Sequence, residues 1–226
     1  MQNQRSNREM AERLEGRFGL TTEQWLKVIE TFSAVLLSLA ALGTSWSGYQ
    51  AGRWNGQMAT RFNQAGALRV ESVRNSGVAS RNVQIDVQLF TGWLGAVAAN
   101  NQALADFYRM RFRPEFVPAF EAWLASRPLE HRQAASSPFE LPEYQLAAQE
   151  EANRLEREAS AMFEEGITAN QIGDRYVLNT VILALVLFFS GMVSNFKILF
   201  VRITLIAIAL GLLVYGVSRL LVYPML

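Results

Sequence analysis

Cysteine is absent from this chain of 226 residues, and histidine occurs once. Without cysteine there are no disulfide bonds, thiolate metal sites or thiol nucleophiles, and the redox compartment stays open. The single histidine, His131, lies in a proline-containing stretch and has no second histidine with which to share a metal ion. We therefore expect neither a cofactor nor a metal site.

An excess of charge of one sign is also missing. The formal net charge is +1, and the basic residues are interspersed with acidic ones. Proteins that bind nucleic acid carry clustered Lys and Arg, so we expect no nucleic acid partner.

Recognisable catalytic motifs are missing as well. The sequence has no G-x-S-x-G and no glycine-rich phosphate loop. The acidic residues between 150 and 165 could suggest a di-metal site, but such sites also need paired Glu-x-x-His motifs. A solvated helix face with pairs such as Glu150 and Arg154 explains them instead. We therefore expect no catalytic residues and no enzyme activity.

Three long apolar stretches are present, at residues 28–46, 176–196 and 198–218. As helices, each is long enough to cross the ~30 Å hydrocarbon core of a bilayer. The sequence therefore predicts an all-α membrane protein with three transmembrane helices. The lipid bilayer is its first expected partner.

The orientation follows from the basic residues near the ends of the spans. Residues 1–27 contain five basic residues, and Lys197 and Arg202 flank the turn between the second and third spans. Both regions lie on the same side of a three-span protein, so we place them in the cytoplasm. Residues 47–175 and the tail, residues 219–226, are then extracytoplasmic. The long polar start, with four carboxylates, does not resemble a cleaved signal peptide.

Residues 47–175 are expected to be helical and to form an extramembrane antiparallel bundle continuous with the first two spans. One apolar seam runs Val83, Val87, Phe90, Leu94 and Val97, and a second seam of small residues runs from Tyr144 to Gly173. A helix break is expected at Asn75-Ser76-Gly77, where glycine can cap a helix. Further breaks are expected at Pro114 and Pro128, with a short helix between them.

Two charged residues lie at the edge of the spans. Glu30 is near the cytoplasmic mouth of the first span, and Arg202 is near the start of the third. Ionisable residues at membrane depth are candidates for function. We predict that Glu30 and Arg202 pair across helices; alternatively, each reaches the lipid boundary separately.

Aromatic residues mark two candidate contact regions. Trp46, Tyr49 and Trp54 follow the first span, where an interfacial aromatic belt is expected. Residues 107–124 combine six aromatic side chains with three arginines around two prolines. This composition suits lipid headgroups or a partner protein, and ordinary packing of a helix corner is the alternative. The candidate contact residues in this segment are Arg109, Arg111, Arg113, Phe116 and Trp123.

Several stretches resemble an uncharacterised bacterial family of three-span membrane proteins with an extracytoplasmic helical domain. They are Trp46-Ser-Gly-Tyr-Gln with Arg53-Trp54, Ala67-Leu-Arg-Val-Glu-Ser, Asp106-Phe-Tyr, Arg111-Phe-Arg-Pro-Glu-Phe, Pro118-Ala-Phe-Glu-Ala-Trp-Leu and Pro142-Glu-Tyr-Gln-Leu. The resemblance implies location in the bacterial inner membrane. It implies no activity.

The sequence therefore predicts a non-enzymatic structural or accessory protein of the inner membrane. Seams of small residues on long helices indicate self-association or a place in a larger complex of membrane proteins. One alternative is a ligand-sensing protein that acts through a partner, because the polar N-terminal segment is too short for an output domain. A second alternative is an oligomeric pore, supported by Thr31, Ser33, Ser38 and Thr44 along the first span.

Overall fold

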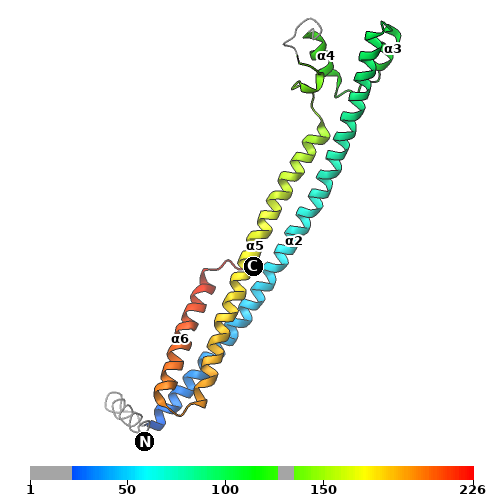
Figure 1. Cartoon of the computed structure of the whole chain (residues 1–226). Helices are drawn as coiled ribbons and strands as arrows, with labels where there is room; N and C mark the ends of the chain where they lie inside the picture. The colour runs from blue at the N-terminus through cyan, green and yellow to red at the C-terminus, as the bar shows by residue number, and fades with distance from the viewer. Residues whose placement is uncertain (1–21, 127–134) are drawn as a thin grey trace. The chain divides into compact units, whose positions relative to one another are not determined.

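Three helices account for most of the structure: α2 (Thr22–Ala98), α5 (Ala147–Met192) and α6 (Leu199–Val222) (Figure 1). The computed structural model describes residues 22–126 and 135–226, and no strand occurs within those ranges. The shorter elements are α3 (Gln102–Arg109), α4 (Val117–Ala125) and the 3-10 turns η1 (Pro138–Glu140) and η2 (Val193–Asn195). The predicted all-α class is confirmed.

All three main helices are long and apolar enough to cross a membrane. This is consistent with the predicted multi-pass membrane protein. Neither α2 nor α5 is interrupted where its apolar stretch meets the polar region. Residues 1–21, which form most of the polar N-terminal segment, lie outside the described residues.

The chain divides into two units, which are described separately. Unit 1 comprises the residues up to Arg61 together with Glu164–Leu226, and unit 2 comprises Phe62–Phe163.

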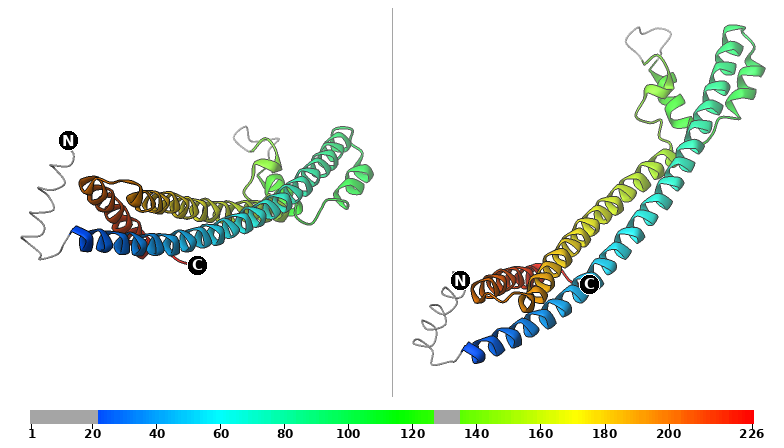
Figure 2. Two further views of the ribbon diagram at one scale, coloured as in Figure 1. Left: turned by 90° about the horizontal axis from the view of Figure 1, so that it is seen from below. Right: turned by 60° about the horizontal axis from the view of Figure 1, so that its bottom comes forward.

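In unit 1, α6 lies beside α5 and the first part of α2, and the three helices share one core cluster (Figures 1 and 2). Hydrogen bonds from Ser33 to Ser190 and from Asn179 to Ser47 show that α2 and α5 are antiparallel. The central layer of the core consists of Leu36, Ala40, Leu183, Val186, Ala209 and Leu213. Most other apolar side chains on these helices point outward, as expected for surfaces that face lipid.

The Leu183 side chain of unit 1 lies between two glycines. A Cβ atom at Gly216 would stand 2.8 Å from Leu183 Cδ2, and one at Gly43 would stand 3.0 Å from Leu183 Cδ1. Both distances are shorter than ordinary van der Waals contact. Glycine at these two positions therefore lets α2 and α6 approach α5 closely.

Replacing Gly216 with valine is expected to destabilise the bundle by about 1–3 kcal/mol, because the new side chain overlaps Leu183. Thermal unfolding in mild detergent, followed by circular dichroism, measures the effect. Gly211→Val is the matched control, since a Cβ atom at Gly211 meets nothing within 4 Å. Equal stabilities for the two variants would contradict this account of the packing.

Unit 2 contains a face of α2 that is buried at every seventh residue: Ala65, Ser72, Ala79 and Asp86. The Ser72 hydroxyl donates a 2.8 Å hydrogen bond to the carbonyl oxygen of Ala152 on α5. On α5, Ala152, Leu155 and Ala159 are buried, which confirms this part of the predicted small-residue seam. Small side chains on both helices allow their backbones to approach closely.

The helix break expected at Asn75-Ser76-Gly77 is wrong, because α2 continues through these residues to Ala98. Glycine inside a helix costs only about 1 kcal/mol relative to alanine. Burial of Ser72 before this site and of Ala79 after it favours a continuous helix. The chain therefore does not turn back here.

The prediction that the apolar residues from Val83 to Val97 form the buried face of this helix is wrong for most of them. Phe90 is buried, but Val87, Leu94 and Val97 are exposed. The buried residues here include Asp86, which is polar, and Ala96, which is small. A search for large apolar residues selects neither of them.

The turn that ends α2 is made by asparagines. Asn100 has φ 57°, a left-handed conformation that asparagine tolerates well. The Asn101 side chain caps α3 by accepting a hydrogen bond from the backbone N–H of Leu104 at 3.1 Å. The short helix expected after Pro114 is confirmed as α4. Part of the expected loop, residues 127–134 including His131, lies outside the described residues.

Candidate functional site

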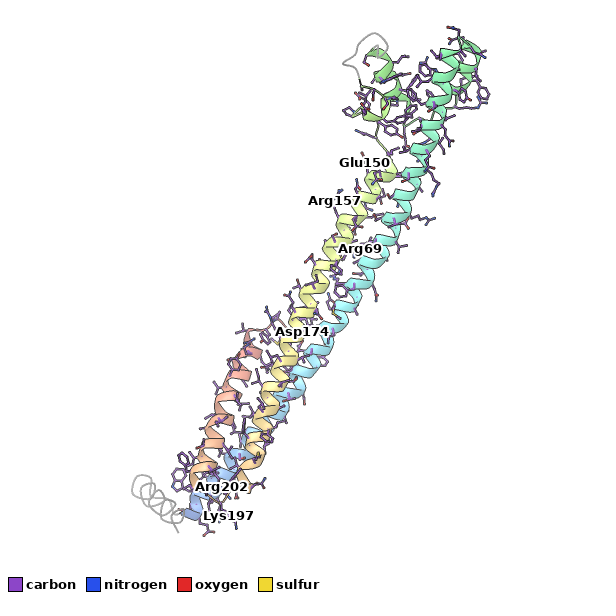
Figure 3. All side chains as sticks on the ribbon, viewed as in Figure 1. Arg69, Glu150, Arg157, Asp174, Lys197 and Arg202 are labelled. Carbon is purple, nitrogen blue, oxygen red and sulfur yellow. The ribbon has the colours of Figure 1, made fainter. Side chains whose placement is uncertain are left out.

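The structure brings Glu30 and Arg202 together at one end of unit 1. Arg202 Nη1 lies 3.5 Å from Glu30 Oε1, and Arg202 Nε donates a 2.6 Å hydrogen bond to the carbonyl oxygen of Phe196. The Arg202 side chain is 12% exposed, whereas that of Glu30 is 59% exposed. Lys197 lies at the same end of the unit (Figure 3). The pair joins α2 to α6, and its contribution to packing stays a prediction.

A cleft of about 200 Å³ lies beside Glu30, between α2 and the end of α5. Its polar lining residues are Glu30, Ser33, Ser190 and Ser194, and the others are Ala34, Leu37, Gly191 and Val193. Ser33 Oγ donates to the carbonyl oxygen of Ser190 at 2.7 Å, which ties the two helices together. The Oγ atom of Ser190 is buried and has no hydrogen-bond partner among the described residues.

A second polar contact lies deeper in unit 1. Asn179 Nδ2 donates to Ser47 Oγ at 3.0 Å, and both side chains are buried. The Oδ1 atom of Asn179 and the hydroxyl of Thr44 are buried without a hydrogen-bond partner in the described part of the chain. Polar contacts between apolar helices hold the register of their packing.

The last residues of the chain pack against α2 and α5. The buried Gln50 side chain donates to the carbonyl oxygen of Leu226 at 3.4 Å and accepts from its N–H at 3.2 Å. Trp54 Nε1 and the Tyr176 hydroxyl both donate to the carbonyl oxygen of Pro224, at 3.1 and 3.2 Å. These contacts hold the segment after α6 in place.

The three aromatic residues predicted after the first span have different surroundings. Trp46 and Tyr49 are exposed, with ring centroids 5.8 Å apart. Trp54 instead packs with Ala51, Tyr176 and Tyr223. A lipid contact therefore stays a prediction for Trp46 and Tyr49, whereas Trp54 has a structural role in holding the tail.

An aromatic cluster forms the core of unit 2. Phe116 is fully buried, and Phe90, Phe112, Phe120 and Trp123 are between 1% and 7% exposed. The Trp123 indole N–H donates to the carbonyl oxygen of Ala135 at 2.9 Å. The headgroup or partner contact predicted for Phe116 and Trp123 is therefore wrong for this chain. Core packing explains both residues.

Asp86 joins three segments of unit 2 through one carboxylate oxygen. Asp86 Oδ2 accepts hydrogen bonds from Arg113 Nη1 at 3.2 Å and from the Tyr144 hydroxyl at 2.9 Å. Arg113 also pairs with Glu115. Asp86 is fully buried, and its Oδ1 atom has no hydrogen-bond partner among the described residues.

Burial raises the pKa of Asp86, and the Tyr144 hydrogen bond and the Arg113 charge act in the opposite direction. The pKa of Tyr144 is also raised, first by burial and then by Asp86, so the phenol keeps its proton and donates it. Arg113 is thus held in an internal ion pair. Its predicted role at the surface is replaced by a structural one.

Asp86→Ala is expected to destabilise unit 2 by about 1.5–3 kcal/mol, because Arg113 keeps its pair with Glu115 but Arg113 and the Tyr144 hydroxyl both lose the carboxylate that accepts their hydrogen bonds. Tyr144→Phe removes only one hydrogen bond and should cost about 1 kcal/mol. Chemical denaturation of the purified protein, followed by tryptophan fluorescence, measures both. If both variants unfolded at the same denaturant concentration as the unmodified protein, the Asp86 carboxylate would not stabilise unit 2.

Arg109 and Arg111 have exposed side chains, unlike Arg113. Arg109 Nη2 lies 3.7 Å from Glu121 Oε1. The Arg111 guanidinium lies over the Phe107 ring, with its Cζ atom 3.5 Å from the ring centroid. Phe107 and Met110 are also exposed. A surface contact through Arg109 and Arg111 stays a prediction.

The acidic residues of α5 take part in ion pairs at the surface. Arg154 pairs with Glu151 and Glu158 along the helix, and Arg61 pairs with Glu165 on the neighbouring helix. Within residues 22–126 and 135–226, no group of three or more His, Cys, Asp or Glu side chains could hold a metal ion. Ion pairs thus account for Glu151, Glu158 and Glu165 of the acidic run, and Arg154 pairs with Glu151 and Glu158 in place of the expected Glu150.

One feature of α2 is not apparent from a search for large apolar residues. Gly48, Gly52 and Gly56 repeat at intervals of four, so they share one face of the helix. All three are exposed, and a Cβ atom at any of them would meet nothing within 4 Å. The spacing G-x-x-x-G could have revealed this face.

No protein-family model, curated protein or solved structure matches this chain. The roles of its residues are therefore argued from the geometry of each unit.

Proposed function

We propose that this protein is a non-enzymatic structural or accessory protein of the bacterial inner membrane. It crosses the bilayer with α6 and the apolar parts of α2 and α5. Its N-terminus lies in the cytoplasm, and residues 47–175 form an extracytoplasmic helical region. It acts as an oligomer or as a subunit of a larger membrane complex.

The glycine face of α2, formed by Gly48, Gly52 and Gly56, carries this proposal. Glycine costs about 1 kcal/mol per position in a helix, so a repeated glycine needs a compensating contact. Gly43 and Gly216 have such contacts within the chain, with Leu183. The glycine face has none among the described residues. These glycines follow the first predicted span, which ends at residue 46. Because glycine has no side chain, another helix can approach the α2 backbone closely at this face, which supports contact with another copy or another membrane protein just outside the span.

Gly52→Leu is expected to reduce self-association, because a large side chain in the middle of the glycine face separates the two backbones. Light scattering of the protein in mild detergent should change from an oligomer toward the mass of one chain. Gly211→Leu is the control, since Gly211 is also exposed with open space at its Cβ position but has no glycine four residues away.

The result distinguishes self-association from membership of a larger membrane complex. An oligomer that Gly52→Leu dissociates and Gly211→Leu leaves intact supports self-association through the glycine face. An unmodified protein that is already a single chain in mild detergent, and that copurifies with no other membrane protein, would contradict the proposal.

The proposed orientation can be tested with single cysteines, because the natural chain has none. Gln88→Cys, at an exposed position of α2, should react with a membrane-impermeant maleimide in intact spheroplasts. Lys197→Cys, in the exposed turn between α5 and α6, should react only after the membrane is opened. The reverse pattern would place both regions on the opposite sides.

A further inference from the structure

The cleft beside Glu30 contains polar groups that contacts within the chain do not satisfy. Ser190 is 2% exposed, and its hydroxyl has no hydrogen-bond partner in the described part of the chain. Arg202 is not a lining residue of the cleft, and its Nη1 atom lies 3.5 Å from Glu30 Oε1, which is beyond a short charge-assisted hydrogen bond. Most of the Glu30 side chain is exposed, so its carboxylate can accept further hydrogen bonds. Buried polar groups without partners are rare and call for an explanation.

The depth of the cleft limits what can occupy it. Glu30 follows the start of the first predicted span, residue 28, by two residues, so it lies about 3 Å from the boundary of the span. This argument rests on the proposed function, in which α2 crosses the bilayer. Lipid headgroups surround a protein at this depth, and a lipid is therefore the ligand present at the highest concentration.

The lining of the cleft is complementary to a cation that donates hydrogen bonds. Its charged member is the carboxylate of Glu30, and its other polar side chains are three serine hydroxyls. Ser33 uses its proton on the Ser190 carbonyl, so its oxygen remains an acceptor. Among the described residues, no basic side chain lines the cleft, and Arg202 contacts Glu30 from outside the lining. A primary ammonium group, with three N–H donors, matches this set of acceptors.

The lining changes from polar to apolar with depth. Glu30 lies at the outer end, Ser33 and Ala34 lie one turn deeper, and Leu37 lies two turns deeper along α2. A phospholipid has the same order of polarity, from headgroup to acyl chain. We infer that the cleft binds phosphatidylethanolamine, with its ammonium group at Glu30 and the serines.

The test compares lipids with matched acyl chains. The purified full chain in mild detergent is titrated with phosphatidylethanolamine, phosphatidylcholine or phosphatidylglycerol, and bound lipid is counted by native mass spectrometry. Phosphatidylcholine has a cation without N–H donors, and phosphatidylglycerol has no cation. Because hydrogen bonds to charged groups are strong, phosphatidylethanolamine should bind about tenfold more tightly than phosphatidylcholine.

Glu30→Gln should remove most of this preference, because it removes the negative charge. Glu23→Gln is the matched control: Glu23 lies on the same helix, and its side chain is 82% exposed and paired with Lys27. Thermal unfolding of both variants shows whether the loss of the Arg202 pair alters folding.

Gly191→Leu gives an independent test that leaves Glu30 and Arg202 unchanged. A Cβ atom at Gly191 meets nothing within 4 Å, so the leucine side chain can fill the cleft without a clash. This variant should also lose the preference for phosphatidylethanolamine. Gly211→Leu, which places leucine on α6 away from the cleft, should keep it.

Three results would overturn the inference. They are equal binding of the three lipids, a preference that survives both Glu30→Gln and Gly191→Leu, and displacement of the lipid by free ethanolamine or Na⁺. The last result would assign the cleft to a soluble cation. Failure of the proposed function would be distinguishable, because the chain would then be released from membranes by an alkaline carbonate wash.

Discussion

Close approach of helix backbones is the constraint on which both units depend. In unit 1, Leu183 of α5 fits between Gly43 of α2 and Gly216 of α6. In unit 2, small residues of α2 such as Ala65 and Ala79 are buried, as are Ala152 and Ala159 of α5. Membrane helices gain little from burying apolar surface against each other, because lipid is as apolar as their side chains. Close packing and a few polar contacts therefore hold unit 1 together.

The polar contacts add specificity to this packing. A hydrogen bond between Ser33 and Ser190, and another between Asn179 and Ser47, allow only one alignment of α2 with α5. In unit 2, Asp86 holds Arg113 and Tyr144, which lie on segments far apart in the sequence. A buried carboxylate is costly unless its partners are in place, so it favours the single arrangement that provides them.

The glycines and the polar groups of unit 1 each divide into those that make contacts within the described chain and those that do not. The glycines that pack inside the chain are explained by Leu183, and the glycine face of α2 is left for a contact outside it. Likewise, the hydrogen bond from Ser33 is satisfied within unit 1, whereas the Ser190 hydroxyl and most of the Glu30 carboxylate are not.

The sequence by itself determined the helical class, the three apolar stretches and the small-residue seam of α5. These features depend on local composition and on spacing along one helix, which the sequence states directly. It also identified Glu30 and Arg202 as a possible pair, since charges are conspicuous in apolar stretches.

Only the tertiary structure decided whether α2 continues through Gly77, which face of residues 83–97 is buried, and where the aromatic residues of segment 107–124 lie. Gly77 is compatible with a cap or with a helix interior, and burial of Ser72 before it and of Ala79 after it favours the second. Phe116 and Trp123 suit a surface contact or a core equally well by composition. Their burial depends on Phe90 and Phe139, which lie far away in the sequence and meet them only in the folded chain.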